Sequence, residues 1–224
     1  MRLRNFVNEL ASRYGNGITF IDVDETIFQT KALIYVVKDG KVIKKLTNQE
    51  FNTYTLGEGE SWDFQEFTSA ELFAKTSIPI PKVVDRIKNM FRKAGIRDSR
   101  VIILTARSDF DDKEVFLNTF SKAGIPIDRI YVERTGNMKT GTTSERKEKT
   151  VLKYIKDGDY RRVRLIDDDM ANIKGFLKTM NNLDPKIITK VKEKHGIDGD
   201  ESIKPIETYA LLVVDETGKL KRIQ

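Results

Sequence analysis

The sequence predicts an α/β fold in which a mainly parallel sheet lies between two layers of helices. Short apolar runs alternate along the chain with amphipathic segments whose apolar residues recur at helical spacing. Strands that alternate with single helices are typical of parallel sheets that helices cover on both faces. The apolar runs that we expect to form this sheet are residues 18–21, 101–104, 129–132 and 163–166.

Helices are expected in the segments between these strands. Several of the segments are followed by a glycine, a residue that commonly lies just beyond the last turn of a helix. We expect helices at residues 2–14, from about 80 to 95, and at 111–123, 145–156 and 170–180. The polar stretch 192–204 is expected to be a loop.

Two segments depart from this alternation. In residues 28–79, Asp39-Gly40 separates two apolar runs, a strong signal for a β-hairpin, and a helix-like stretch follows at 64–73. Near the C-terminus, residues 209–214 and 219–223 flank the polar turn 215–218 and predict a second hairpin. The expected architecture is therefore an α/β core with a small insertion and a C-terminal hairpin.

Composition excludes several kinds of chemistry. The 224 residues include no cysteine and one histidine, which rules out disulfides and thiolate sites and disfavours histidine-based catalysis. No apolar run approaches the roughly 20 residues that a membrane helix needs, and the N-terminus lacks the apolar core of a secretory signal, so we expect a cytoplasmic protein. The net charge of +6 suits phosphate-bearing partners, although a solvated lysine-rich surface is an equally good explanation.

Polar side chains that suit phosphoryl transfer follow the predicted strands. In open α/β sheets, ligands bind beyond the carboxyl ends of the strands, so these side chains should meet at one edge. Carboxylates can bind Mg²⁺ and act as nucleophile or acid, while a hydroxyl and a lysine can hold phosphoryl oxygens. The residues are Asp22, Asp24, Thr26, Thr105, Lys149, Asp167, Asp168, Asp169 and Asn172.

In their order and spacing, these residues resemble the motifs of the haloacid dehalogenase superfamily of aspartate-nucleophile phosphatases. The stretch 22–26 resembles its first motif, Asp-x-Asp-x-Thr after an apolar strand, and Thr105 resembles the second. Lys149 resembles the third motif, and 167–172 resembles the fourth in its Asp-Asp-x-x-x-Asn form. The resemblance implies a Rossmann-like three-layer α/β/α sandwich, with a catalytic core at 1–27 and 80–224 and a small cap at 28–79.

The resemblance also implies a role for each matching residue. Asp22 would be the nucleophile and a Mg²⁺ ligand, and Asp24 the general acid and base whose backbone carbonyl also reaches the metal. Asp168 would be the third metal ligand, with Asp167 as the alternative because the double aspartate leaves the register open. Asn172 would support the metal side. The residues expected to bind the substrate are Thr26, Thr105, Arg107 and Lys149, and of these Thr105 and Lys149 are also counted as catalytic.

Several alternatives remain open at this point. Lys147 is the rival of Lys149, and Arg107 could form a surface salt bridge instead of binding phosphate. Trp62, Phe64 and Phe67 could stack on a base or sugar, or could form an apolar face that holds the insertion onto the core.

The expected function is Mg²⁺-dependent hydrolysis of phosphate monoesters, with a nucleotide or a nucleic-acid 3′-phosphate end as the suggested substrate. The alternative is a catalytically inactive domain of this fold that binds nucleic acid or protein. A receiver-type signalling domain is disfavoured because its acidic pair precedes, and its lysine follows, the other motifs.

Overall fold

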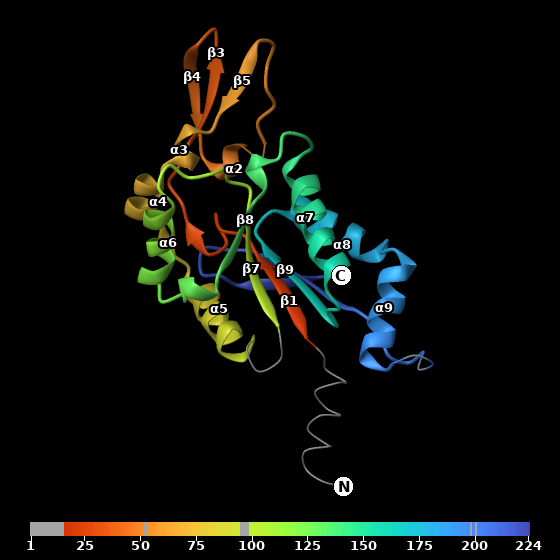
Figure 1. The fold of residues 1–224 in the computed structure, drawn as a ribbon. Helices are drawn as coiled ribbons and strands as arrows, with labels where there is room; N and C mark the ends of the chain where they lie inside the picture. Colours follow the sequence, from red (N-terminus) through yellow and green to blue (C-terminus); the bar gives the residue numbers. More distant parts are fainter. Residues whose placement is uncertain (1–15, 52, 95–98, 198, 200) are drawn as a thin grey trace.

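A mainly parallel sheet of six strands forms the centre of the molecule (Figure 1). The structure, a computed structural model, describes residues 16–51, 53–94, 99–197, 199 and 201–224, so the helix expected at 2–14 lies outside the described residues. The strand order is β11-β10-β9-β1-β7-β8, and only the terminal strand β11 pairs antiparallel with its neighbour. The strands are β1 (Gly17–Ile21), β7 (Arg100–Thr105), β8 (Tyr131–Arg134), β9 (Arg162–Asp167), β10 (Glu207–Val213) and β11 (Leu220–Ile223).

Helices cover both faces of this sheet. The side chains of β1 alternate between the two faces, because Ile18 and Phe20 belong to one apolar cluster and Ile21 to the other. The cluster that contains Ile21 includes residues of α5 (Pro81–Ala94) and α6 (Lys113–Lys122). The opposite cluster includes residues of α7 (Thr143–Asp157), α8 (Met170–Asn181) and α9 (Pro185–His195). The structure thus confirms a mixed α/β fold with a mainly parallel sheet.

The helix α9 was not expected from the sequence, and residues 192–195, which were expected to be a loop, form its last turn. Its start nevertheless carries two ordinary signals. Asp184 caps it by accepting a hydrogen bond from the backbone N–H of Lys186, and Pro185 occupies the first turn. The C-terminal hairpin is present, and it extends the sheet because β10 pairs in parallel with β9.

Residues 28–79, here called the insertion, protrude from the carboxyl end of the central strands (Figure 1). Asp39 and Gly40 both have positive φ, at 50° and 72°, as the two-residue turn of a hairpin requires. The helix expected at 64–73 is divided in two because Ser69 caps a second helix. The elements are β2 (Phe28–Gln29), β3 (Ile34–Lys38), β4 (Lys41–Leu46), α2 (Asn48–Phe51), β5 (Glu60–Asp63), α3 (Gln65–Thr68), α4 (Ala70–Thr76) and β6 (Ile78–Pro79).

The pairings within the insertion explain how it is attached. Strands β4, β3 and β5 form a three-stranded antiparallel sheet, and the short strands β2 and β6 pair at its base, where the chain leaves and re-enters the core. A separate apolar cluster with Ile34, Val36 and Leu46 at its centre stabilises the protruding part. The insertion therefore has a small core of its own above the central sheet.

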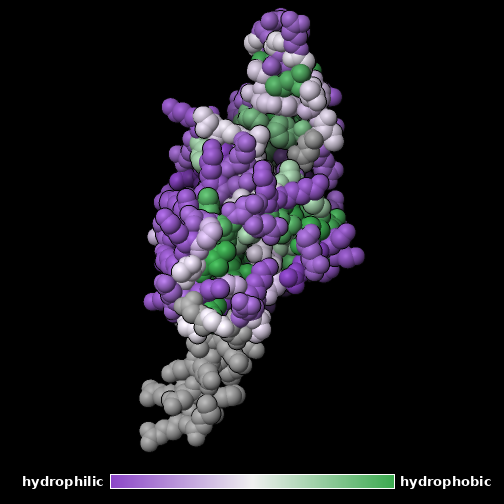
Figure 2. All heavy atoms as spheres, turned by 90° about the vertical axis from the view of Figure 1, so that its right-hand side faces the viewer, coloured by the Kyte–Doolittle hydropathy of each residue, from purple (hydrophilic) through white to green (hydrophobic). Residues whose placement is uncertain are grey.

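The outer surface is mixed in character. The view in Figure 2 shows hydrophobic side chains below the hydrophilic tip of the insertion and in the middle of the body, among more abundant hydrophilic residues. In the part of the chain that the structure describes, no helix combines the length and the apolar character needed to cross a membrane. Two 3-10 helices, Ile127–Arg129 and Thr135–Asn137, flank β8.

Candidate active site

The candidate site lies where the direction of strand addition reverses. From β1 the chain adds β7 and β8 on one side of the sheet, and then crosses to add β9 on the other side. In open α/β sheets, this reversal creates a crevice at the carboxyl ends of the two strands involved. Those ends carry Asp22, directly after β1, and Asp167 and Asp168 at the end of β9.

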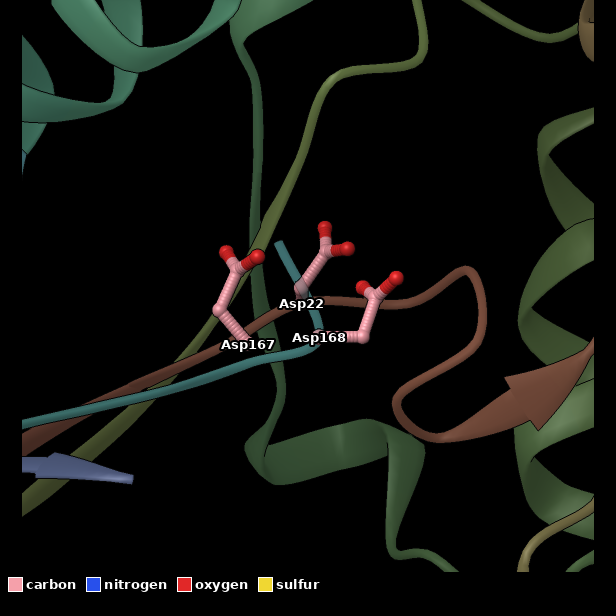
Figure 3. A group of neighbouring side chains, drawn as sticks. All are labelled: Asp22, Asp167 and Asp168. Carbon is pink, nitrogen blue, oxygen red and sulfur yellow. The ribbon is translucent and has the colours of Figure 1, made fainter. Parts of the chain in front are cut away.

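Three carboxylates meet at this edge. Asp22, Asp167 and Asp168 each offer an oxygen atom, and these oxygens all lie within 4.8 Å of one another. Figure 3 shows the three carboxylates on the same side of the two strand ends. Asp22 and Asp167 are buried, and Asp168 is half-buried. Such a concentration of negative charge is costly unless a cation offsets it.

Lys147 supplies one compensating charge. Its Nζ lies 2.9 Å from Oδ1 of Asp22 and 2.8 Å from Oδ2 of Asp167, and the side chain is buried. Lys149, which the sequence reading preferred at this position, is exposed and does not reach the carboxylates. The structure therefore corrects that choice: the lysine at the strand edge is Lys147, on the buried face of α7.

The surroundings of Asp22 and Asp168 favour the protonated forms of these two carboxyls. Burial raises the pKa of Asp22 to about 7, and the charges of Asp167 and Asp24 add to this against the opposing effect of Lys147. Burial and the charge of Asp22 raise the pKa of Asp168 to about 8. Burial by itself would lower the pKa of Lys147, but the charges of Asp167 and Asp22 outweigh it and raise that pKa. One lysine thus leaves the three carboxylates incompletely neutralised.

The two aspartates of β9 differ in the partners that they already have. Asp167 accepts hydrogen bonds at Oδ1 from the side-chain amide of Asn172 and the backbone N–H of Asp169, and at Oδ2 from Lys147. Asp168 accepts one from the hydroxyl of Thr26, at 3.2 Å, and lines a cavity. Asp168 is therefore the more available ligand, while Asp167 holds Lys147 and Asn172 in place.

Asp24 lies outside this group and is bound by Arg107. The guanidinium donates from Nε to both carboxylate oxygens, at 3.2 and 3.0 Å, and from Nη2 to Oδ1 at 2.7 Å. Its Nη1 donates to the carbonyl of Phe67 in the insertion, and the guanidinium lies 4.5 Å from the centre of the Phe67 ring. Arg107 is buried, so its ion pair with Asp24 is not a surface salt bridge, and Arg107 is also one of the residues that line the cavity described below. It connects Asp24 to the insertion.

The two threonines of the predicted motifs are buried beside the site and hydrogen-bond to residues around it. Thr26 is fully buried and donates to Asp168. Thr105 is also fully buried, and its hydroxyl accepts a hydrogen bond from the backbone N–H of Arg107 at 3.1 Å. Neither side chain lines the cavity, although both were expected to bind the substrate. Their observed contacts fix Asp168 and the loop after β7.

A cavity of about 240 Å³ opens above the carboxylates. The core contributes acidic and basic side chains to its walls, among them Asp22, Asp168, Arg146 and Lys147. The insertion contributes Ile34, Asn48, Phe51, Phe64 and Phe67. Trp62, which the sequence grouped with Phe64 and Phe67, lies behind this wall and packs on Phe51.

Sequence reasoning did not identify Asn48, Phe51 or Arg146 as cavity residues. Asn48 and Phe51 belong to the four-residue helix α2, which no sequence period revealed. Arg146 precedes Lys147 in the first turns of α7, where the capping box of Thr142 and Glu145 marks the helix start. That box was an available signal, since it marks where the helix begins.

Comparison with protein-family models and with curated proteins found no match to this sequence.

Proposed function

We propose that this protein is a Mg²⁺-dependent phosphatase with a Rossmann-like three-layer core, of the haloacid dehalogenase type, which hydrolyses phosphate monoesters through a phosphorylated Asp22. One observation carries the proposal. Asp22, Asp168 and Lys147 come from three separate segments and line the same cavity at the point where the strand order reverses. Two carboxylates with a buried ammonium form an arrangement that suits phosphoryl transfer.

The donor set fits a magnesium ion. Mg²⁺ prefers oxygen ligands from one or two carboxylates and completes its coordination with water and substrate phosphate. Asp22 and Asp168 supply carboxylate oxygens at the cavity, and three carboxylates lie within 4.8 Å of one another with one lysine between them. Oδ1 of Asn172 is buried and accepts no hydrogen bond from any described residue. This orphaned oxygen and the uncompensated charge both support a cation here.

In the proposed reaction, an oxygen of Asp22 attacks phosphorus while the ester bond to the leaving oxygen breaks. The leaving oxygen takes a proton, and an acyl phosphate remains on Asp22. Attack by water on phosphorus then releases inorganic phosphate and restores the carboxylate. When bound, Mg²⁺ would neutralise the charge of the phosphoryl oxygens. Lys147 contributes a fixed positive charge beside Asp22 in both steps.

Asp24 is the proposed proton donor to the leaving oxygen and the base that activates water. Arg107 donates three hydrogen bonds to the Asp24 carboxylate and engages both of its oxygens, so this ion pair must open before Asp24 can contact the leaving group. Arg107 also binds the carbonyl of Phe67 in the insertion. In this proposal, movement of the insertion and release of Asp24 are therefore linked.

The direct test is hydrolysis of p-nitrophenyl phosphate by the purified protein with and without Mg²⁺. The parent should hydrolyse it only when the metal is present, and Asp22→Asn should lose at least roughly a thousandfold in kcat, since it removes the nucleophile. Asp184→Asn is the matched control, because Asp184 caps α9 away from the cavity and asparagine is an equally good cap.

Two outcomes would count against the proposal. Equal activity in Asp22→Asn and the parent would exclude Asp22 as the nucleophile. A parent that binds Mg²⁺ but hydrolyses no phosphate ester would favour the inactive binding domain instead.

A further inference from the structure

The part of the cavity wall that comes from the insertion is largely aromatic. Phe51 ends α2, and Phe64 and Phe67 lie at the start and within α3, so all three come from the insertion. The ring centre of Phe64 lies 5.7 Å from that of Phe51 and 6.3 Å from that of Phe67. The three rings are therefore neighbours and together form an aromatic part of the cavity wall.

Other aromatic side chains of the insertion pack against these rings, and one of the rings, that of Phe64, remains partly exposed. Trp62 packs edge-to-face on Phe51, with ring centres 4.8 Å apart, and Tyr54 packs on Trp62 at 5.7 Å. These residues join the apolar cluster of the insertion, which accounts for how the insertion is stabilised without Phe64. Phe64 itself remains 41% exposed. A large aromatic side chain that lines a cavity and stays partly exposed is available to contact a ligand.

The cavity also has polar side chains that could bind the phosphate and the sugar or base edge of such a ligand. Arg146 donates to the carbonyls of Met138 and Thr142 and to the hydroxyl of Thr143, and no carboxylate of the described residues forms an ion pair with it. Its charge therefore remains available to a phosphate. The side-chain amide of Asn48 and the hydroxyl of Ser108 also line the cavity and can hydrogen-bond a ring edge or a sugar.

We propose that this cavity takes a nucleoside phosphate, with the phosphate at Asp22 and Lys147 and the nucleobase against Phe64 and its neighbours. This inference rests on the proposed function and adds its substrate class. A sugar phosphate would leave the aromatic surface facing water, whereas a nucleobase covers it by stacking. Base–aromatic stacking changes affinity by roughly 5- to 150-fold when the aromatic side chain is truncated. A phosphorylated nucleotide at the end of a nucleic-acid strand presents the same combination of base and phosphate.

The experiment compares adenosine 5′-monophosphate with ribose 5-phosphate, which carries a hydroxyl at C1′ where the nucleotide carries its base. Binding is measured by calorimetry to Asp22→Asn with Mg²⁺, and kcat/KM is measured with the parent. Adenosine 5′-monophosphate should be preferred at least tenfold, and Phe64→Ala should weaken that preference by roughly 5- to 150-fold while ribose 5-phosphate changes little. Ile43→Ala is the matched control, because Ile43 is 50% exposed in the same insertion but does not line the cavity.

The outcomes separate this inference from the proposed function. Equal use of the two compounds, or a preference that survives Phe64→Ala, overturns the nucleobase site and leaves the phosphatase standing. Absence of hydrolysis with a clear binding preference overturns the phosphatase and supports the nucleobase site. Thymidine 3′-monophosphate and a 3′-phosphorylated oligonucleotide, compared in the same way, identify which source the site accepts: tighter binding of the oligonucleotide indicates a strand end.

Discussion

Replacement of Lys147 by methionine tests the electrostatic centre of the site. Methionine has a similar length but no charge, so Lys147→Met removes both contacts of the ammonium, at 2.9 Å to Asp22 and 2.8 Å to Asp167. Breaking a buried ion pair by removing one partner costs about 3–5 kcal/mol, because the remaining charge is left uncompensated. For a domain of this size, that corresponds to a fall in Tm of roughly 6–20 °C.

The measurement is urea unfolding at pH 8 in the presence of a chelator, with the free energy of unfolding compared between variants. Lys149→Met is a closely matched control, since Lys149 lies two residues away on the same helix and is exposed. Its effect should stay within about 0.5 kcal/mol. At pH 5 the cost of Lys147→Met should shrink, because the pKa values of about 7 for Asp22 and about 8 for Asp168 allow both carboxyls to be protonated there.

Two results would contradict this prediction. Lys147→Met and Lys149→Met could lower the free energy of unfolding equally, or the loss caused by Lys147→Met could be the same at pH 5 and pH 8. Either result would mean that Lys147 does not balance the charge of the carboxylates.

Four further predictions concern the same region. Burial raises the pKa of Asp22 to about 7 and that of Asp168 to about 8 from 3.8, so the folded carboxyls keep protons that the unfolded chain releases. The stabilisation that these two carboxyls provide is complete below pH 3.8 and is lost as the pH rises through 7 and 8. The free energy of unfolding of ion-free protein, measured in urea, should therefore fall between pH 5 and pH 8. A pH dependence identical to that of Asp168→Asn would contradict this prediction. At pH 8, Mg²⁺ at about a hundred times its Kd should raise the free energy of unfolding by about 2.7 kcal/mol. The measurement is the shift of the urea midpoint, and this shift should be smaller in Asp168→Asn. Arg107→Lys keeps the charge but loses the two-pronged contact with Asp24, so kcat should fall at least roughly tenfold, and an unchanged kcat would argue against that positioning role. In Gly136→Ala, the new Cβ would lie 2.4 Å from the carbonyl oxygen of Ala106, so thermal unfolding should show a loss of roughly 1–3 kcal/mol, and a Tm equal to that of the parent would show that the loop adapts freely.

The regular part of the fold could be predicted from local patterns. Three of the runs expected as strands lie wholly within β1, β7 and β9, because strands buried on both faces consist of consecutive apolar residues. The fourth, 129–132, is only half correct, since β8 begins at Tyr131 and Arg129 ends a 3-10 helix. The turn Asp39-Gly40 predicted its hairpin because few residue pairs tolerate two positive φ angles. The helix α9 was not predicted although Asp184 and Pro185 mark its start, because Ile187 and Val191 are the only buried residues in a helix that is otherwise rich in lysine.

The lysine of the site shows how a local error arises. Lys147 and Lys149 differ by two positions, which is roughly 200° around a helix, so they point in opposite directions. The buried residues of α7 are Lys147, Thr150, Val151 and Ile155, a face that repeats every three or four residues. Lys149 lies three residues before Leu152, which is only half-buried, so the spacing from Lys149 to Leu152 does not mark the buried face of α7.

The sequence by itself determined most strands of the central sheet and several of the helices beside it, and that carboxylates follow two of the strands, because these depend on local spacing and apolar runs. Only the tertiary structure decided which strands are neighbours. The placement of β1 between β7 and β9 brings Asp22 to Asp168, residues separated by most of the core sequence. It also decided that Arg107 binds Asp24 and that Phe64 faces the cavity, because these contacts depend on how the insertion packs over the sheet.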